Sequence, residues 1–356
     1  MKYYIKIAPQ NPLFFRKGNR FTKGKDTWAE SYLLPNPSTI WGALFAKLMA
    51  DNTELSKKVK NENLTNDKLA EILTIEDIML YDGTSFIVPA PSICLKEKNS
   101  FSAEYPKSFI NLDEEGVISS NNEIKYIPSH DGDYTESSTS YHTYYENLFE
   151  SVSKSNLIPS ERLLKQYPKI GIKINNNTGI SEESMLYNTD VTEFNENYSI
   201  VVEVEIHEDY KFKEEKGFLK LGGESNVSKY AMMDSKRYLR IKNVQKFDEG
   251  EDNYTDLFAM YFKTSAILQN NELKEVLEKS NFKIICVKFN GSFIVGGYDM
   301  KKNCQKDKVK AIGAGSCYIV KYNEKTESKK LKELLNKELN TVKEYQGFGK
   351  YEIIGL

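Results

Sequence analysis

The sequence of 356 residues contains few of the residues on which common catalytic and secreted architectures depend. It has three histidines and four cysteines, and no two cysteines form a CxxC pair. The cysteines are Cys94, Cys286, Cys304 and Cys317. Cysteines this far apart neither cross-link a small secreted fold nor hold zinc, so we expect a cytoplasmic protein. No apolar run approaches about 18 residues and Met1 leads straight into an expected strand, so we expect neither a membrane partner nor a signal peptide.

The sequence also lacks an excess of charge of either sign. Its 49 Lys and Arg residues are balanced by 51 Asp and Glu residues, which leaves a formal net charge of −2. A protein that binds nucleic acid over most of its surface is strongly basic, so a nucleic-acid surface here must be a local patch. With 40% hydrophobic residues the chain can bury a sizeable core. Its length suggests about two domains.

Catalytic motifs are absent as well. There is no Walker A loop and no Gly-x-Ser-x-Gly elbow. A metal-independent ribonuclease commonly takes its acid and base from histidine, but His130, His142 and His207 are remote in sequence from the basic and glycine-rich segments. Gly222-Gly223-Glu224 is similar to a turn of nucleotide cyclases, but Ser225-Asn226 follow and leave one carboxylate where two-metal chemistry needs two. We therefore predict no catalytic residues, no metal site and no cofactor.

The sequence does contain a dense group of cations and aromatic rings near its start. Phe14, Phe15 and Phe21 alternate with five cations, Arg16, Lys17, Arg20, Lys23 and Lys25. Single-stranded nucleic acid is bound by this combination, because cations contact phosphates and aromatic faces stack on bases. A basic hairpin loop over a core helix would have the same pattern. Directly afterwards a helix is expected, with Ser38 as N-cap and the first-turn amides around Ser38 and Thr39 able to bind an anion.

Two glycine-rich turns offer further backbone amides. Gly222 and Gly223 follow a short strand, and Gly347-Phe348-Gly349-Lys350 precedes the last expected strand. Glycine allows close approach of the backbone to a ligand, and the second turn adds an aromatic ring and a cation. Each turn is also explained by ordinary chain reversal or a helix C-cap.

Hydrophobic periodicity predicts the fold class. Residues 2–8 alternate as a half-buried strand, and an apolar stripe at helical spacing follows. The members of this stripe are Ile40, Trp41, Leu44, Phe45 and Leu48. A hairpin is expected over residues 75–88, with its turn at Asp82-Gly83. This order is the opening of a ferredoxin-like, or RRM-like, βαββαβ unit. Residues 96–165 show no sustained period and are expected to form a long irregular insertion.

The second half suggests another such unit. Strands are expected over residues 169–174, 180–187, 200–206, 218–221, 282–289, 292–297, 309–321 and 351–354, and helices over 257–268, 272–278 and 327–339. We predict an α+β protein of two ferredoxin-like units. The first spans residues 1–220 and contains the insertion at about 96–165, and the second spans residues 221–356.

Taken together, these blocks resemble the third subunit of the type III-B (Cmr) CRISPR effector complex, a family of the RAMP superfamily. The matching blocks occur in the family's order at residues 12–21, 37–44, 171–187, 221–224, 297–300, 313–316 and 347–349. The resemblance implies a non-catalytic subunit that holds the 5′ tag of the CRISPR RNA. It also implies two protein partners, the polymerase-like large subunit and the RAMP backbone subunit.

On this interpretation the cations of the first block contact RNA phosphates, and the helix start and both glycine turns line the same groove. The expected RNA-binding residues are Arg16, Lys17, Arg20, Lys23, Lys25, Ser38, Thr39, Gly222, Gly223, Gly347, Phe348, Gly349 and Lys350. An alternative is a RAMP-type metal-independent endoribonuclease that processes CRISPR precursor RNA. A third possibility is a scaffold that contacts only protein, through the same cations.

Overall fold

The computed structural model describes most of the chain. The described residues are 1–17, 28–106, 108–111, 126–129, 134–136, 140–149, 155–174, 181–224, 226–243, 255–268, 272–299, 304–326, 328–339 and 342–356. They form a mixed α+β fold, as the periodicity predicts. Among them, no helix is both long enough and apolar enough to cross a bilayer.

The first half forms an eight-stranded antiparallel sheet of order β12-β10-β4-β3-β15-β1-β17-β16. Its strands are β1 (Lys2–Pro9), β3 (Leu73–Tyr81), β4 (Phe86–Pro89), β10 (Tyr141–Tyr144), β12 (Ile158–Pro159), β15 (Ser199–Ile206), β16 (Lys216–Lys220) and β17 (Val227–Met232). The predicted hairpin is confirmed, because β3 and β4 pair with Leu80 opposite Ile87. The boundary expected after residue 220 falls between β16 and β17, which pair with each other.

Three helices follow β1 and cover one face of this sheet: α1 (Pro37–Asp51), α2 (Thr53–Asn61) and α3 (Asn66–Ile72). The predicted apolar stripe of α1 is buried throughout. The predicted N-cap at Ser38 is wrong. Asn36 is the N-cap and Pro37 is the first helical residue. Proline suits this position because its φ is already helical, and because the amide hydrogen that it lacks would have no partner in the first turn. The Thr39 amide donates to the Asn36 carbonyl oxygen at 2.8 Å.

The second half forms a four-stranded sheet of order β19-β24-β18-β25. Its strands are β18 (Thr255–Phe262), β19 (Phe282–Lys288), β24 (Cys317–Thr326) and β25 (Tyr351–Gly355), and its helices are α6 (Glu272–Lys279) and α7 (Ser328–Glu338). The helix predicted over residues 257–268 is wrong. The first half of that segment belongs to β18, a central strand that is buried on both faces and therefore has a continuous apolar sequence instead of an alternating one.

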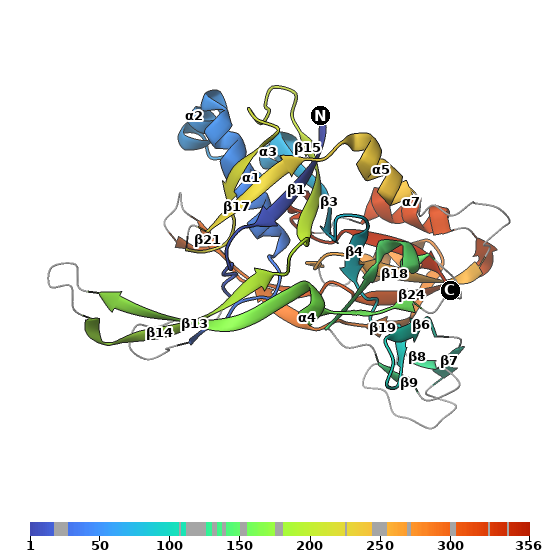
Figure 1. Cartoon of the computed structure of the whole chain (residues 1–356). Coiled ribbons are helices and arrows are strands. Elements are labelled where there is room, and N and C mark those ends of the chain that lie inside the picture. Colours follow the sequence, from blue (N-terminus) through green and yellow to red (C-terminus); the bar gives the residue numbers. More distant parts are fainter. Residues whose placement is uncertain are drawn as a thin grey trace.

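The two sheets pack face to face between two layers of helices (Figure 1). Tyr4 of β1 and Tyr261 of β18 belong to the core between the sheets. Their chain neighbours Ile5 and Met260 point to the opposite faces and belong to the outer cores, which α1 and α6–α7 cover. Alternation along the strands thus builds the three largest hydrophobic cores among the described residues.

The remaining elements decorate this four-layer body. They are β2 (Trp28–Ala29), β5 (Leu95–Glu97), β6 (Ser102–Glu104), β7 (Ser108–Asn111), β8 (Tyr126–Ser129), β9 (Tyr134–Glu136), η1 (Tyr145–Leu148), β11 (Ser155–Asn156), α4 (Ser160–Leu163), β13 (Leu164–Ile174), β14 (Ser181–Phe194), α5 (Ser235–Asn243), β20 (Ser292–Val295), β21 (Tyr298–Asp299), β22 (Cys304–Gln305), β23 (Val309–Ile312) and η2 (Glu344–Gln346). The insertion predicted as irregular contains several of the short strands. The strand expected over residues 309–321 is divided into β23 and β24 by residues 313–316.

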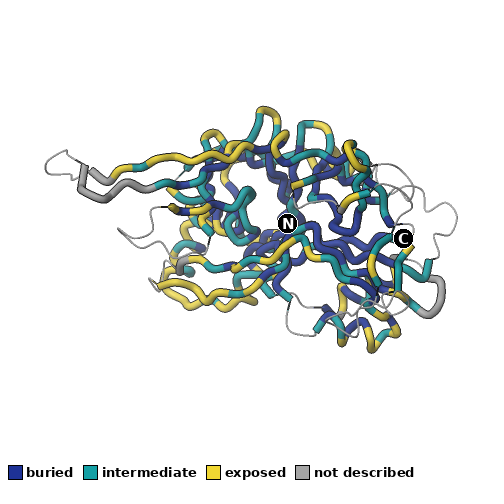
Figure 2. Tube along the Cα trace, turned by 90° about the horizontal axis from the view of Figure 1, so that it is seen from below, coloured by how far each residue is buried: buried dark blue, intermediate teal, exposed yellow. Residues whose placement is uncertain are grey.

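The long hairpin β13–β14 projects from the body (Figure 1), and the described part of β13 is largely exposed, whereas that of β14 is mostly half-buried or buried (Figure 2). At its base, β2 adds a third strand beside β14, with Trp28 opposite Asn188. This places the end of the predicted basic segment against the hairpin.

Candidate nucleic-acid interface

The basic segment leaves the body from a pair of extended chains. Arg16 forms an antiparallel bridge with Ser31, and the Lys17 amide donates to the Glu30 carbonyl oxygen at 2.9 Å. Arg16 is exposed, while the Lys17 ammonium lies 3.1 Å from the Glu30 carboxylate. These contacts pair the two ends of the basic segment with each other, and bridges of Leu13 to Thr192 and of Ala29 to Thr189 join both ends to β14. The other predicted cations, Arg20, Lys23 and Lys25, lie outside the described residues.

The Gly222-Gly223 turn packs directly against this segment. The Gly223 amide donates to the Phe14 carbonyl oxygen at 2.8 Å. Gly222 has a φ of +79°, and a Cβ there would lie 2.7 Å from the same carbonyl oxygen. A Cβ on Gly223 would lie 2.9 Å from Cδ1 of the Phe14 ring. These glycines are required for close approach to the basic segment, and the Gly223 amide is already engaged by it.

The Gly347–Lys350 loop is instead built into the protein interior. The Phe348 side chain is 0% exposed and packs in a small core with Ile267, Val295 and Ala311. Its ring, expected to stack on RNA, is therefore covered by protein on all sides. Gly347 has a φ of +91°, and a Cβ there would lie 2.9 Å from side-chain atoms of Ile75 and Ile78.

The amides and the cation of this loop are engaged as well. The Gly349 amide donates to the Ser265 carbonyl oxygen at 2.9 Å, and the Lys350 amide donates to Thr264 Oγ1 at 3.0 Å. The Lys350 ammonium lies 3.8 Å from the Glu76 carboxylate and 3.6 Å from that of Glu344, with only 12% of the side chain exposed. We conclude that this loop docks the second half of the chain onto β3.

Strand β20 contacts residues beside both glycine turns. On one side it contacts Tyr32, whose amide donates to the carbonyl oxygen of Phe15, a neighbour of Gly222. The Tyr32 hydroxyl donates to the Ile294 carbonyl oxygen at 3.0 Å, and the Tyr32 ring lies 5.1 Å from that of Phe293. The next residue, Val295, packs with Phe348. The Gly222 turn contacts Phe14 and Phe15, which directly precede Arg16 and Lys17 in the chain, whereas the Gly347 loop packs against Val295 of β20 through Phe348. The shared RNA-binding groove stays a prediction. Ser38 and Thr39, at the start of α1, are half-buried.

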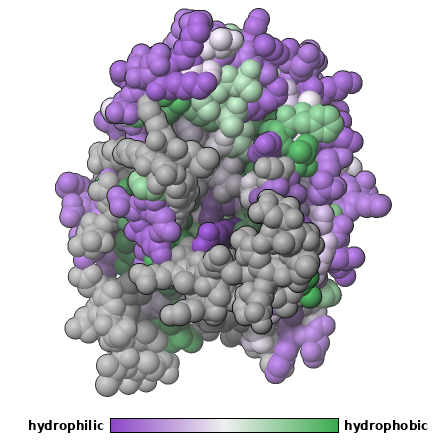
Figure 3. All heavy atoms as spheres, turned by 90° about the vertical axis from the view of Figure 1, so that its left-hand side faces the viewer, coloured by the Kyte–Doolittle hydropathy of each residue, from purple (hydrophilic) through white to green (hydrophobic). Residues whose placement is uncertain are grey.

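An exposed aromatic residue that the sequence reasoning missed lies beside the basic segment. The Trp28 side chain is 51% exposed, and its Nε1 donates to Asp190 Oδ2 of β14 at 3.1 Å. Its position directly after the cations was the available signal. On the side of the molecule from which the hairpin projects, the described surface is mostly hydrophilic with smaller hydrophobic patches (Figure 3).

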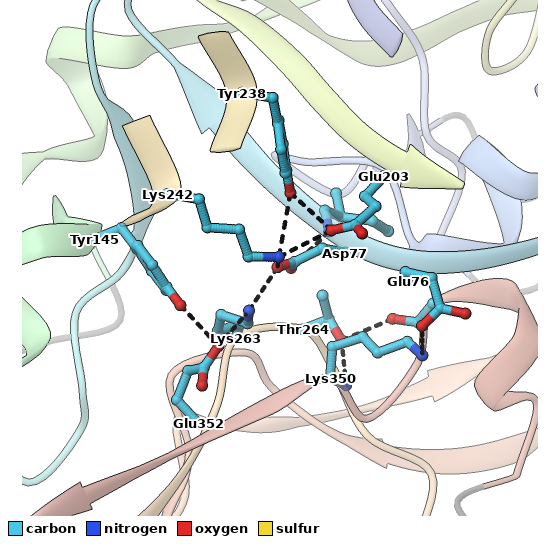
Figure 4. A network of polar contacts seen from close by, with 12 residues as sticks. Glu76, Asp77, Tyr145, Glu203, Tyr238, Lys242, Lys263, Thr264, Lys350 and Glu352 are labelled. Atoms are coloured by element: carbon cyan, nitrogen blue, oxygen red, sulfur yellow. Dashed lines mark hydrogen bonds and ion pairs between the residues drawn. The ribbon is translucent and has the colours of Figure 1, made fainter. Parts of the chain in front are cut away.

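The second feature that the sequence reasoning missed is a buried ionic network (Figure 4). Lys263, which follows β18, has its Nζ 2.7 Å from Asp77 Oδ2 and 2.8 Å from Glu352 Oε1. All three residues are buried. Asp77 belongs to the first sheet and Glu352 to the second, so Lys263 joins the two sheets.

Two helices contribute further lysines to this network. Lys242 of α5 lies 2.9 Å from the Glu203 carboxylate and 3.0 Å from that of Asp77. Lys332 of α7 lies 2.6 Å from Glu352. Each buried carboxylate therefore has at least one ammonium partner, as a buried charge requires.

The pairing decides the protonation states of the carboxyls. Burial by itself would raise the pKa of Glu352, but Lys263 and Lys332 outweigh burial and hold that pKa at about 2. Burial is likewise opposed at Asp77 by Lys263 and Lys242, and the pKa of Asp77 falls well below its ordinary value. These acids stay ionised and neutralised, which suits a structural role. Within the described parts of the chain, no three His, Cys, Asp or Glu residues are grouped to hold a metal ion.

The described histidines do not form a catalytic pair. His142 on β10 is buried, burial lowers its pKa to about 4, and its Nδ1 lies 3.3 Å from Ser160 Oγ. His207, which follows β15, is exposed and lies 3.3 Å from the Asp209 carboxylate. His130 lies outside the described residues.

Two chains in solved structures of a type III-B assembly share this fold. A chain in the cryo-EM structure of the type III-B Cmr-beta complex bound to cognate target RNA matches with a TM-score of 0.50 and 17% identity, over 95% of this chain and 90% of that chain. In the same complex with target RNA and AMPPnP, the TM-score is 0.52 and the identity 18%, with the same coverage. At these identities the matches show a shared fold.

A search of curated proteins found no match. A family model described as "CRISPR-associated protein (Cas_Cmr3)" matches residues 5–355, nearly the whole chain. This agrees with the resemblance that the sequence blocks show. The chain therefore belongs to the Cmr3 family of CRISPR-associated proteins, the family of the third subunit of the type III-B effector complex.

Proposed function

We propose that this chain is a non-catalytic RNA-binding subunit that holds the 5′ tag of the CRISPR RNA in a type III-B effector. The observation that carries the proposal is the basic segment, whose two ends are fixed to the body while Arg16 is exposed. Cations presented from a rigid base lose little freedom on binding phosphate. Family membership and the RNA-bound assemblies of its structural relatives support this function.

We further infer that each sheet belongs to a ferredoxin-like unit. In the second half the chain runs β18–α6–β19–β24–α7–β25, and the sheet order is β19-β24-β18-β25. In the first half, β3, β15, β1 and β17 are neighbours in the equivalent order. Strand β16 stands between β15 and β17 in the chain, where the second unit has its helix α7. This supports the βαββαβ interpretation, with the insertion and the long hairpin between β4 and β15.

The proposal extends to two protein partners and to the absence of catalysis. The polymerase-like large subunit and the RAMP backbone subunit are the proposed neighbours, and copurification of the chain with each subunit without RNA tests them. The ion-paired acids and the separate histidines favour binding over RNA cleavage. Metal-free cleavage of repeat RNA by the purified chain, abolished in His142→Ala or His207→Ala, would contradict this part.

RNA binding is tested by fluorescence anisotropy with tag RNA at several salt concentrations. Arg16→Glu should lower the affinity and flatten the salt dependence by about one to two units of slope, because each phosphate contact contributes about one. Lys337→Glu is the matched control, since Lys337 is an exposed cation on α7 in the other half of the chain. Equal slopes for the wild type and both variants would contradict the assignment of Arg16.

A further inference from the structure

We propose that Trp28 is the stacking site for one base of the bound RNA, with Ile170 extending the same apolar platform at the base of the β13–β14 hairpin. The inference rests on the proposed RNA-binding function and names a contact within it. Trp28 is 51% exposed and Ile170 is 65% exposed. Large side chains this exposed are candidates for ligand contact when they lie together beside a charged site.

Strand register places the two side chains on one face. Trp28 on β2 is paired with Asn188 on β14, and Asn188 is paired with Ile170 on β13. Paired residues point to the same side of a sheet. The next position, Ala29 with Thr189, points to the opposite side and is buried. The three-stranded base therefore turns one face to the body and presents Trp28 and Ile170 on the other.

A single hydrogen bond orients the indole without covering its faces. The Trp28 Nε1 donates to Asp190 Oδ2 at 3.1 Å. Because an indole N–H lies in the ring plane, the carboxylate sits at the ring edge. Asp190 is held in turn by the β14 ladder, where it is paired with Pro168. The ring is thus fixed in orientation before binding, which reduces the entropy that stacking would otherwise cost.

The platform lies close to the cations that would hold phosphates. Lys17 bonds by its amide to Glu30, which is two residues beyond Trp28 in the extended chain. Two residues of strand span about 7 Å. A strand of RNA whose phosphate contacts Arg16 or Lys17 therefore has a base within reach of the indole. Aromatic rings beside cations are the usual composition of single-strand sites. This composition favours a nucleobase as the occupant over an apolar protein surface.

The chain itself provides a selective probe. It has two tryptophans, and the second, Trp41, is 8% exposed with its Nε1 bonded to the Leu73 carbonyl oxygen at 2.9 Å. We expect single-stranded tag RNA to quench the Trp28 emission of the full chain. An oligonucleotide of equal length with abasic sites should quench it far less, because it retains the phosphates and lacks the rings.

Variants separate stacking from charge. Trp28→Ala should weaken binding of tag RNA by roughly 5- to 100-fold, as loss of one stacked base does, while the salt slope stays at the wild-type value. Trp28→Tyr should retain most of the affinity. Phe289→Ala is the matched control, because Phe289 is equally exposed, at 51%, and follows β19 in the other sheet.

The outcomes distinguish this inference from the proposed function. If the wild type binds tag RNA with a clear salt slope but Trp28 is not quenched and Trp28→Ala binds normally, only the stacking assignment fails. If tag RNA does not bind at all, the proposed function fails. If Trp28→Ala weakens the abasic oligonucleotide equally, Trp28 merely anchors the basic segment and the inference is overturned. A change in emission on adding a partner subunit without RNA would also overturn it, in favour of a protein interface.

Discussion

Two regions of this molecule gather charge, and they use it in opposite ways. In the basic segment, Arg16 is exposed and Lys17 is half-exposed beside one carboxylate. In the core between the sheets, Lys263 is 5% exposed and held within 2.8 Å of two carboxylates. Water screens the first group, so it can exchange partners and bind phosphate. The second cannot change partners without leaving a buried charge unpaired, so it fixes the relative position of the two sheets.

The largest expected effect comes from breaking the buried group. Lys263→Met removes the ammonium between Asp77 and Glu352 and should lower the free energy of unfolding by about 3 kcal/mol. This is the low end of the usual cost of breaking a buried pair, because Asp77 keeps Lys242 and Glu352 keeps Lys332 as partners. Urea unfolding measures it. Lys337→Met, at an exposed position on α7, should change stability by no more than about 0.5 kcal/mol. Equal effects of the two variants would refute the structural role of the network.

Low pH should destabilise the protein through the buried ionic network. The folded-state pKa of Glu352 is about 2, below its ordinary value of 4.5. Folding thus lowers this pKa, so the stabilisation is complete above pH 4.5 and disappears as the pH falls toward 2. The loss should be on the order of 3 kcal/mol at Glu352. Urea midpoints measured at a series of pH values test it, and a flat profile below pH 4.5 would contradict it.

Buried His142 should make folding stability depend on pH in a second range, between pH 6.5 and 4, above the range of Glu352. Burial lowers the pKa of His142 from 6.5 to about 4. The unfolded chain therefore takes up a proton at a higher pH than the folded chain, and stability falls as the pH drops from 6.5 to 4. His142→Phe should remove most of the change in stability between pH 6.5 and 4 and leave the change due to Glu352 in place. If stability changed by the same amount between pH 6.5 and 4 in this variant, other groups would be responsible for that change.

A smaller effect is expected at the glycine turn that supports the basic segment. Gly222→Ala forces a left-handed residue to carry a Cβ 2.7 Å from the Phe14 carbonyl oxygen, so it should both destabilise the fold and displace the segment. Gly83→Ala is the control, because Gly83 has a φ of +103° but no atom within 4 Å of its Cβ position. The control should cost about 1–2 kcal/mol for its backbone alone and leave RNA affinity unchanged. Anisotropy with tag RNA and urea unfolding of both variants provide the comparison.

How far the sequence predicts this molecule depends on where the partners lie. The stripe from Ile40 to Leu48 was predicted correctly, because a helix displays its period within a few turns of local sequence. β18 was mistaken for a helix, because a central strand covered on both faces has no alternation to display. The N-cap was misplaced by two residues, from Asn36 to Ser38, because either residue type can cap a helix.

The candidate site was predicted only in its local part. Arg16 and Lys17 are candidates from the sequence alone, since cations interleaved with aromatic residues are visible without a fold, and their contact with RNA stays a prediction. The burial of Phe348 depends on Val295, and the pairing of Lys350 depends on Glu76, and both partners are remote in sequence. Exposed Trp28 and buried Lys263 are also decided by tertiary neighbours. Residue type alone does not show whether a charge or a ring faces solvent.

The smallest change in stability is expected for the exposed ion pair of Lys17 and Glu30, and it is the direct counterpart of the buried pairs of Lys263. Glu30→Gln removes the carboxylate 3.1 Å from Lys17, in a pair whose side chains are 47% and 39% exposed. Such pairs contribute about 0–1 kcal/mol, so urea unfolding should hardly change, in contrast to Lys263→Met. Affinity for tag RNA should rise a few-fold at low salt, because Lys17 no longer has a competing anion, and the salt slope should steepen. Weaker RNA binding by this variant would mean that Lys17 positions the chain and does not contact phosphate. The exposed and the buried lysines would then differ only in the cost of removing them.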